Sequence, residues 1–223
     1  MIESLPSLAF YIKIFVAMLV VVNPLGIIPI FVGMCVSNSD AQNKVIARVA
    51  AQTVAVVLLL CVFMGERLLE LFGISIASFK VGGAILIMLN AMAMMQAAPS
   101  RIKQTPEEAQ EAAAKASIAV VPLGLPLLAG PGAMSTMVIY SSHSKSVLHL
   151  GAVALIALAI ALVTWIALRI ATRVGSFMSM TTVNVATRIM GLLLAALAVE
   201  IFASGIVELI PALGKPDVFR YGQ

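Results

Sequence analysis

Long uncharged stretches dominate the chain, and the charged residues gather in the short segments between them. A helix that spans a lipid bilayer needs about 20 mostly apolar residues. The uncharged stretches predict six spanning helices, at 10–36, 45–64, 74–97, 116–140, 147–169 and 186–209. The sixth is a spanning helix only if one acidic residue, Glu200, lies inside it.

The overall composition agrees with these spans. Of 223 residues, 61% are apolar and 11% are charged, whereas a soluble domain is about 45–50% apolar and about 25% charged. A disordered chain is excluded at this apolar content. A soluble domain is disfavoured because it has too little interior to bury so much apolar surface. The two cysteines exclude a disulfide scaffold and a four-thiolate zinc site. The sequence therefore predicts an all-α integral membrane protein.

The distribution of Lys and Arg predicts how the helices are oriented. Six spans put both termini on one side of the membrane. Slightly more Lys and Arg fall in the loops after the first, third and fifth spans than on the opposite side. Because cytoplasmic loops carry the excess of basic residues, we expect a multi-pass protein of the inner cell membrane with both termini outside the cytoplasm. The first span lacks a basic leader, so we expect it to remain as an anchor.

Two pairs of short motifs recur at nearly the same spacing. Residues 23–26 of the first span read Asn-Pro-Leu-Gly, and residues 130–132 of the fourth span read Gly-Pro-Gly. The third span begins with a basic residue and a glycine-containing apolar run at 80–86, and the sixth span begins in the same way at 188–194. A three-span unit repeated in one chain crosses the membrane in opposite directions, as in the inverted repeats of many secondary transporters.

The fold prediction is therefore six transmembrane helices arranged as two inverted three-helix repeats, with helices 1 and 4 broken. The first repeat covers 1–97 and the second covers 116–210. A hydrophilic linker at 98–115, which contains a short solvated helix, joins them, and a C-terminal tail follows at 211–223.

The Pro and Gly residues inside the first and fourth spans predict breaks in both helices, because Pro removes a backbone N–H and clashes with the preceding turn. The backbone groups freed by a break must face protein or a polar cavity. A half-helix N-terminus offers N–H donors and partial positive charge to a carboxylate, while freed carbonyls suit an ammonium group or a cation. Two matched breaks therefore predict a small zwitterionic substrate.

Eight residues at or just after the breaks are the candidates for substrate binding: Asn23, Pro24, Gly26, Gly130, Pro131, Gly132, Ser135 and Thr136. The polar side chains among them are also the types that cap broken helix ends. Local capping alone, and capping combined with substrate contact, both remain open at this point.

Glu200 is the only acid well inside a predicted span. Acids within a membrane are costly and are functional candidates by default, so Glu200 is a candidate for coupling transport to a proton or for binding the substrate amine. The alternative is a neutral or paired side chain that serves helix packing. Lys80 and Arg188 are expected to anchor their helices at the membrane interface.

The remaining polar and small residues predict little chemistry. We expect His143 and His149 to be solvated in a loop, and Gly82, Gly83 and Gly191 to serve helix packing. The sequence has no metal motif, phosphate loop or catalytic triad. It also has no basic cluster interleaved with aromatic residues, so nucleic acid is not an expected partner.

Taken together, the motifs resemble the MarC family, which includes the SnatA-type transporters of small neutral amino acids. The resemblance extends from about residue 8 to 210 and rests on the segments 23–29, 72–76, 121–133 and 188–194. It implies six spans, two broken helices and, in some members, transport of glycine or alanine. Members of this family also carry Gln at the position of Glu200, so the resemblance disfavours an obligatory proton-carrying role there.

The leading hypothesis is a secondary transporter of small neutral amino acids that works by alternating access. Its partners would be the zwitterionic substrate, a coupling proton or sodium ion and the lipid bilayer, with no cofactor. An exporter or channel for other small solutes or drugs is the alternative, although only 6% of the residues are aromatic and drug cavities are usually aromatic-lined. An enzyme is not expected, because Ser135 has no nearby His and Glu200 has no acidic partner in the sequence.

Overall fold

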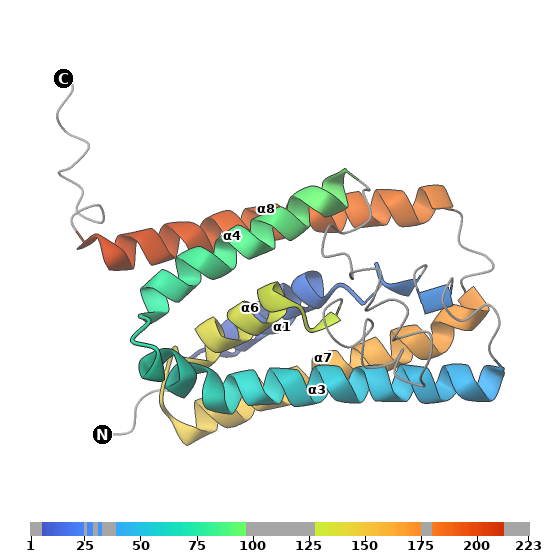
Figure 1. Ribbon diagram of the computed structural model, residues 1–223, viewed down its shortest axis with the longest axis horizontal. Helices are drawn as coiled ribbons and strands as arrows, with labels where there is room; N and C mark the ends of the chain where they lie inside the picture. The colour runs from blue at the N-terminus through green and yellow to red at the C-terminus, as the bar shows by residue number, and fades with distance from the viewer. Residues whose placement is uncertain are drawn as a thin grey trace.

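The computed structural model describes residues 6–24, 26–28, 31–32, 39–96, 128–174 and 180–211. Within these ranges the regular structure is helical, without strands. The helices are, in chain order, α1 (Leu8–Val22), α3 (Asp40–Leu71), α4 (Ile76–Met95), α6 (Pro131–Ser141), α7 (Val147–Val174) and α8 (Met180–Leu209) (Figure 1). The predicted linker, the first part of the predicted fourth span and most of the tail lie outside the described residues.

Four of these helices, α3, α4, α7 and α8, are long and apolar enough to cross a membrane. They correspond to the second, third, fifth and sixth predicted spans, which are thereby confirmed. The helices α1 and α6 have only 15 and 11 residues. At 1.5 Å per residue they are about 22 Å and about 16 Å long, and the hydrocarbon core of a bilayer is about 30 Å thick.

The helix α3 extends beyond the predicted 45–64 at both ends. It begins after Ser39, whose hydroxyl accepts from the Gln42 N–H at 3.3 Å while the Ser39 N–H donates to the Gln42 amide oxygen at 2.8 Å. This reciprocal capping box fixes the start of the helix. At the other end α3 continues to Leu71 and is followed by Gly73, whose φ of 67° lies in the left-handed region that glycine adopts at no steric cost. The prediction stopped at charged residues, but charged residues continue a helix at the membrane surface.

The long helices pack as antiparallel pairs, α4 with α8 and α3 with α7. Lys80 at the start of α4 forms an ion pair with Glu208 at the end of α8. Just before α7, the Lys145 amine lies 3.2 Å from the Glu66 carboxylate near the end of α3. The start of one helix therefore lies beside the end of its partner in both pairs.

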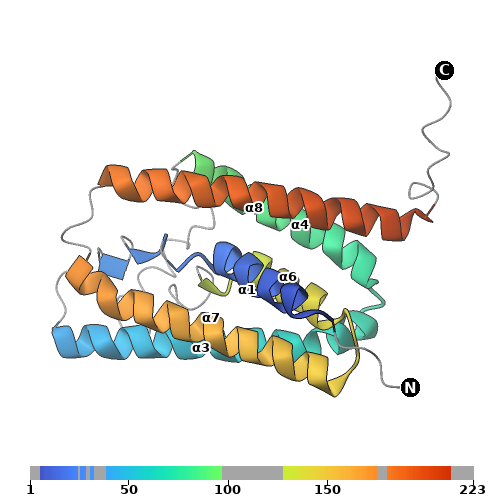
Figure 2. The same cartoon turned by 180° about the vertical axis from the view of Figure 1, so that it is seen from behind.

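The short helices α1 and α6 lie between these two pairs, as Figures 1 and 2 show from opposite sides. They are also antiparallel, since the rings of Phe10 in α1 and Tyr140 in α6 are 6.3 Å apart at one end, and Val21 approaches Gly132 at the other. The helix α1 packs mainly on α6 and α7, whereas α6 packs mainly on α3 and α4. Each short helix therefore has most of its packing partners in the other half of the chain.

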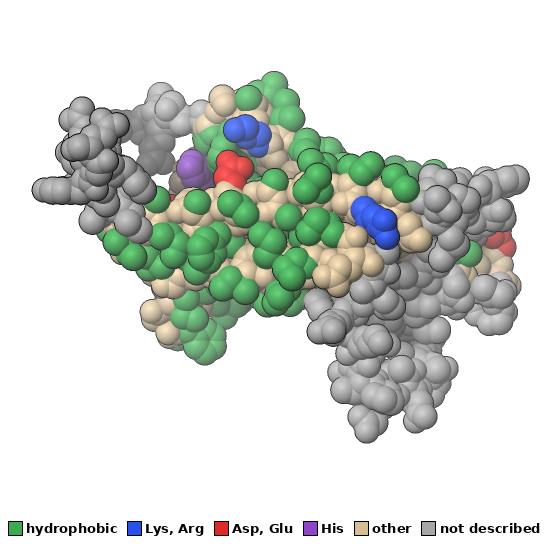
Figure 3. Space-filling view, turned by 90° about the horizontal axis from the view of Figure 1, so that it is seen from above, with side chains coloured by type: hydrophobic (Ala, Val, Ile, Leu, Met, Phe, Trp, Pro, Cys, Tyr) green, Lys and Arg blue, Asp and Glu red, His purple; other side chains and the backbone are tan. Residues whose placement is uncertain are grey.

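The outward faces of the long helices are apolar. Leu60 in α3, Leu155 in α7 and Leu192 in α8 are 51%, 68% and 63% exposed. Figure 3 shows hydrophobic side chains over much of the face formed by α4 and α8, with isolated charged groups among them. Exposed apolar surface of this extent marks contact with a partner or a membrane, and around helices of spanning length it identifies an integral membrane protein.

The glycines predicted to serve helix packing divide into two kinds. A methyl group at Gly83 would lie 2.7 Å from the Ser135 Cβ, and one at Gly191 would lie 3.0 Å from the Ala91 carbonyl oxygen. The packing prediction is confirmed for both. It is wrong for Gly82, which is exposed and would bring a methyl group within 4 Å of no described atom, because this position of α4 faces outward.

Candidate functional site

The end of α1 is shaped by Asn23. This residue has φ of 46° and ψ of 62°, and it is the only residue other than glycine with positive φ among those described. Its N–H donates to the Leu19 carbonyl at 3.0 Å. Asn tolerates the left-handed conformation that ends many helices, and the following Pro24 prevents the helix from continuing. Helix α1 therefore ends at Val22 for a local reason that the sequence motif contains.

The Asn23 side chain also stabilises the turn that follows. The Gly26 N–H donates to both the Asn23 carbonyl, at 3.1 Å, and its side-chain oxygen, at 3.2 Å. A methyl group at Gly26 would lie 2.1 Å from the Asn23 side-chain nitrogen, so a larger residue at 26 would displace the Asn23 side chain from this bond. Two roles were left open for Asn23, local capping alone and capping combined with substrate contact. The geometry shows local capping.

The start of α6 is shaped by Gly130 and Pro131. Gly130 is the N-cap residue, Pro131 occupies the first turn, and the Met134 N–H donates to the Gly130 carbonyl at 3.0 Å. Pro is favoured at the first helical position because its missing N–H would have no partner there. The amides of Gly132 and Ala133 follow in the same turn and have no acceptor within the helix. This end of α6 therefore offers two backbone donors.

The end of α1 and the start of α6 lie next to each other. A methyl group at Gly132 would lie 3.8 Å from the Val21 side chain of α1 and 3.2 Å from the Ile87 side chain of α4. Because α1 and α6 are antiparallel, carbonyls at the C-terminus of α1 approach amides at the N-terminus of α6. The two helix dipoles place partial negative and partial positive charge side by side.

Ser135 and Thr136 lie one turn into α6, and both are buried. The Thr136 hydroxyl donates to the Gly132 carbonyl at 2.7 Å, a common bond of Thr within a helix. Ser135 faces α4, where it lies against Gly83. Val21 and Ile87, which border Gly132, were not singled out from the sequence. They come close to Gly132 only because α1, α4 and α6 pack together.

Glu200 lies apart from this interface. It is exposed on α8, in the neighbourhood of Tyr140. Tyr140 is the penultimate residue of α6, at the opposite end from Pro131. The structure therefore brings together the residues of the two Pro–Gly motifs but does not place Glu200 among them.

The prediction that His149 is solvated is wrong. His149 is fully buried in the first turn of α7, with its Nε2 2.9 Å from the Tyr140 carbonyl and its Nδ1 3.1 Å from the Tyr11 hydroxyl. Because a carbonyl only accepts, Nε2 carries the proton and Nδ1 accepts from Tyr11. The ring thereby links α1, α6 and α7. His143 is exposed, as predicted.

A periodic signal for His149 was present in the sequence. His149, Val153, Ala157 and Leu168 belong to one buried stripe of α7, and the first three are spaced by four, which is the helical period of a buried face. The loop was expected to extend through His149, whereas α7 already begins at Val147.

Two pockets open between the long helices. One, of about 300 Å³, lies between the start of α3 and the end of α7. The other, of about 280 Å³, lies between α4 and α8 and is lined by apolar side chains such as Met88 and Phe202. None of the predicted substrate-binding residues lines either pocket. Among the described residues no group of three His, Cys, Asp or Glu side chains is arranged to hold a metal.

The spanning helices, the apolar exterior and the two short helices between them define a polytopic helical membrane protein. More specifically, the chain belongs to the MarC family, since the family described as MarC family integral membrane protein matches residues 8–210. The family resemblance that the motifs suggested is thereby confirmed.

Relatives from distant organisms match nearly the whole chain. The UPF0056 membrane protein YhcE of Escherichia coli is 40% identical over 96% of this chain and 99% of its own length. MJ0972 of Methanocaldococcus jannaschii is 36% identical over 93% of this chain and 91% of its own, and YvbG of Bacillus subtilis is 32% identical over 92% and 98%. No solved structure matches this chain.

Proposed function

We propose that this protein is a secondary transporter of small neutral amino acids such as glycine or alanine. The observation that carries the proposal is the meeting of two helix ends inside the molecule, the C-terminus of α1 at Val22 and the N-terminus of α6 at Pro131. A zwitterion needs an acceptor group and a donor group a few ångströms apart, and these two helix ends supply them without a charged side chain.

In this proposal the substrate carboxylate accepts from the free amides of Gly132 and Ala133. The substrate ammonium donates to carbonyls in the last turn of α1, which have no partner within the helix. Ile87 and Val21 approach Gly132 closely, so the proposal requires a substrate with a small side chain. Asn23 holds the end of α1 in position, and the bonded Thr136 hydroxyl fixes the first turns of α6.

The packing supports two inverted repeats, 1–97 and 116–210. The long helices α3 and α4 pack antiparallel on α7 and α8 in the same order, which is the arrangement of repeats related by an axis in the membrane plane. The N–H of Phe31 donates to the Ile27 carbonyl at 2.8 Å, a helical bond that supports a second half-helix after the turn at Asn23. Alternating access then comes from rocking one repeat against the other.

Coupling to a proton or sodium gradient completes the proposal. Glu200, near Tyr140, is the candidate for carrying a proton, at a distance from the substrate. The proposal also includes the orientation inferred from the loops. The protein lies in the inner cell membrane, and both of its termini lie outside the cytoplasm.

Uptake by liposomes tests the function directly. The purified protein is reconstituted, and uptake of labelled glycine and alanine is measured with an imposed proton or sodium gradient. The expected result is saturable uptake that excess unlabelled alanine inhibits. If folded protein shows no saturable uptake under either gradient, or if it moves bulky drugs without competition from amino acids, the proposal is overturned.

A further inference from the structure

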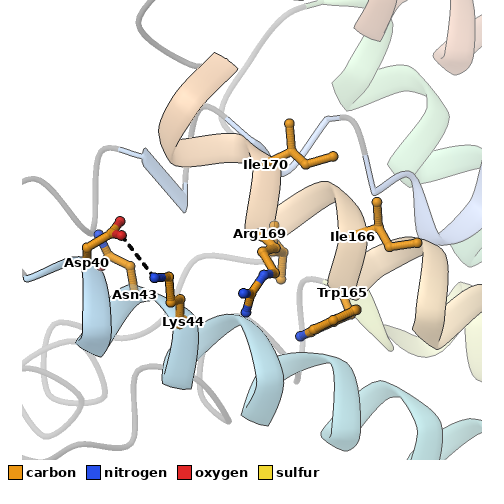
Figure 4. Close-up of a pocket in the computed structure, with 8 residues that line it drawn as sticks. Asp40, Asn43, Lys44, Trp165, Ile166, Arg169 and Ile170 are labelled. Atoms are coloured by element: carbon orange, nitrogen blue, oxygen red, sulfur yellow. Dashed lines mark ion pairs between the residues drawn. The ribbon is translucent and has the colours of Figure 1, made fainter.

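The pocket between α3 and α7 has the features of a ligand site that is separate from the proposed transport path. It has a volume of about 300 Å³ and is lined by Asp40, Asn43, Lys44, Trp165, Ile166, Leu168, Arg169 and Ile170. Figure 4 shows Lys44 from α3 and Arg169 from α7 extending into the space between the two helices. The lining residues come from the first turns of one spanning helix and the last turns of the other.

The charge of this pocket favours an anion. Asp40 pairs with Lys44, whose amine is 3.2 Å from the carboxylate, so the described lining leaves Arg169 as the unbalanced charge. The Arg169 guanidinium lies 5.4 Å from the centre of the Trp165 ring. Stacking on an aromatic ring orients a guanidinium and leaves its N–H edge free for a phosphate. The N-terminus of α3 adds partial positive charge at the same place.

Asn43 places a second, independent requirement on the ligand of this pocket. The residue is 9% exposed, and its side-chain oxygen is the one buried side-chain polar atom in the described part of the chain without a hydrogen-bond partner. A buried acceptor without a donor is destabilising. Asn43 also lines the pocket, so a small rotation of its amide brings this oxygen to a ligand that carries a hydroxyl or an ammonium N–H beside its anionic group.

The position of the pocket identifies the source of such a ligand. Ile166 and Ile170 are 43% and 46% exposed beside Trp165 on a spanning helix, so apolar surface continues from the pocket along the membrane-facing side of α7. Trp and basic residues at the ends of spanning helices mark the level of the lipid headgroups. Basic pockets between such helices bind headgroups.

We propose that this pocket binds the headgroup of a glycerophospholipid. The phosphate accepts from Arg169 and Lys44, the headgroup hydroxyl or ammonium donates to the Asn43 side-chain oxygen, and an acyl chain lies along Ile166 and Ile170. Phosphatidylglycerol and phosphatidylethanolamine meet these requirements. Phosphatidylcholine carries the same phosphate but has no N–H or O–H donor in its headgroup. The bound lipid bridges α3 and α7.

Native mass spectrometry of the delipidated full chain in detergent tests the proposal. The protein is titrated separately with phosphatidylglycerol, phosphatidylethanolamine and phosphatidylcholine, and lipid binding is also measured with inorganic phosphate as competitor. We expect the first two lipids to bind about tenfold more tightly than phosphatidylcholine, the effect of one hydrogen bond to Asn43. Equal binding of all three lipids overturns the proposal. Displacement of lipid by millimolar phosphate overturns it in favour of a soluble anion.

Two variants and one control locate the site. Asn43→Leu is expected to abolish the preference over phosphatidylcholine while leaving binding of phosphatidylcholine itself unchanged. Arg169→Ala is expected to weaken binding of all three lipids by at least about tenfold, because it removes a charge-assisted hydrogen bond. Arg188→Ala, which removes an exposed basic side chain at the same end of the helices but outside the pocket, is the matched control.

The pattern across the variants decides the outcome. If Arg188→Ala weakens binding as much as Arg169→Ala, the lipid is held by general basicity and the site is refuted. If Asn43→Leu does not fold, the preference of the wild-type protein for lipids with a donor in the headgroup still decides whether Asn43 has the inferred role.

Discussion

The interface between α1 and α6 and the pocket between α3 and α7 are polar in different ways. At the first, two short helices end inside the protein, and the polarity comes from backbone amides and carbonyls at Gly132 and Val22. At the second, two long helices end at the membrane surface, and the polarity comes from Lys44, Asn43 and Arg169. Charged side chains are costly within the bilayer and not at its surface, which agrees with an interior site that, in our proposal, is built from main chain.

The largest expected effect comes from closing the backbone site. Gly132→Val places methyl groups against Ile87 and Val21, beside the first amides of α6. We expect alanine uptake by liposomes to fall at least about a hundredfold, the effect of displacing bound groups by about 1 Å. Gly82→Val, at an outward-facing position of α4, is the control and retains uptake. Normal uptake by Gly132→Val would show that the helix ends are not the site.

At the opposite end of the α1–α6 pair, side chains hold the two helices together. Losing these contacts should lower the stability of the protein. His149→Ala removes both ring hydrogen bonds and leaves a cavity, so we expect unfolding to become easier by about 2–4 kcal/mol. Thermal unfolding in detergent measures this change. His143→Ala, at an exposed position nearby, should change the stability by less than about 0.5 kcal/mol. Equal effects of the two variants would contradict the buried role of His149.

A pair of substitutions at Asn23 separates backbone conformation from side-chain contact. Asn23→Ala replaces a residue that tolerates the left-handed region with one that adopts it only at a cost of about 1–2 kcal/mol, and uptake should fall about tenfold. Asn23→Gly keeps this conformation accessible and should retain most of the uptake. If both variants lose uptake equally, the Asn23 side chain contacts the substrate and does more than hold the turn.

The smallest effect is expected at the ion pair between α4 and α8. Lys80→Ala removes the partner of Glu208, whose side chain is 46% exposed. Exposed pairs contribute about 0–1 kcal/mol, so the melting temperature in detergent should shift by only a few degrees at most. A larger loss would show that charges at the ends of the helices stabilise this fold more than their exposure suggests.

The sequence predicted those parts of the fold that depend on local pattern. Four long spans followed from runs of apolar residues, and the end of α1 and the start of α6 followed from Asn23-Pro24 and Gly130-Pro131. The helix limits were less accurate, because the second span was predicted to end at 64, before the charged residue Glu66, whereas Glu66 and Glu70 both lie within α3.

The sequence could not predict features made by residues that are far apart in the chain. The burial of His149 depends on Tyr11 and Tyr140, and the pocket at Asn43 depends on Arg169, which lies on another helix. Neither Asn43 nor Arg169 stands out in a linear reading, since one lies in a polar helix start and the other is an ordinary basic residue at the end of a predicted span. Their significance arises only when α3 and α7 are packed.

Each of the two short helices packs mainly on helices of the other half of the chain, and this has a consequence for biogenesis. Because α1 rests mainly on α6 and α7, it has few protein neighbours while the first three helices alone have left the ribosome. The bilayer or the insertion machinery must shield it until α6 and α7 are synthesised. The centre of the molecule is therefore completed only late in assembly, after α6 and α7 have been synthesised.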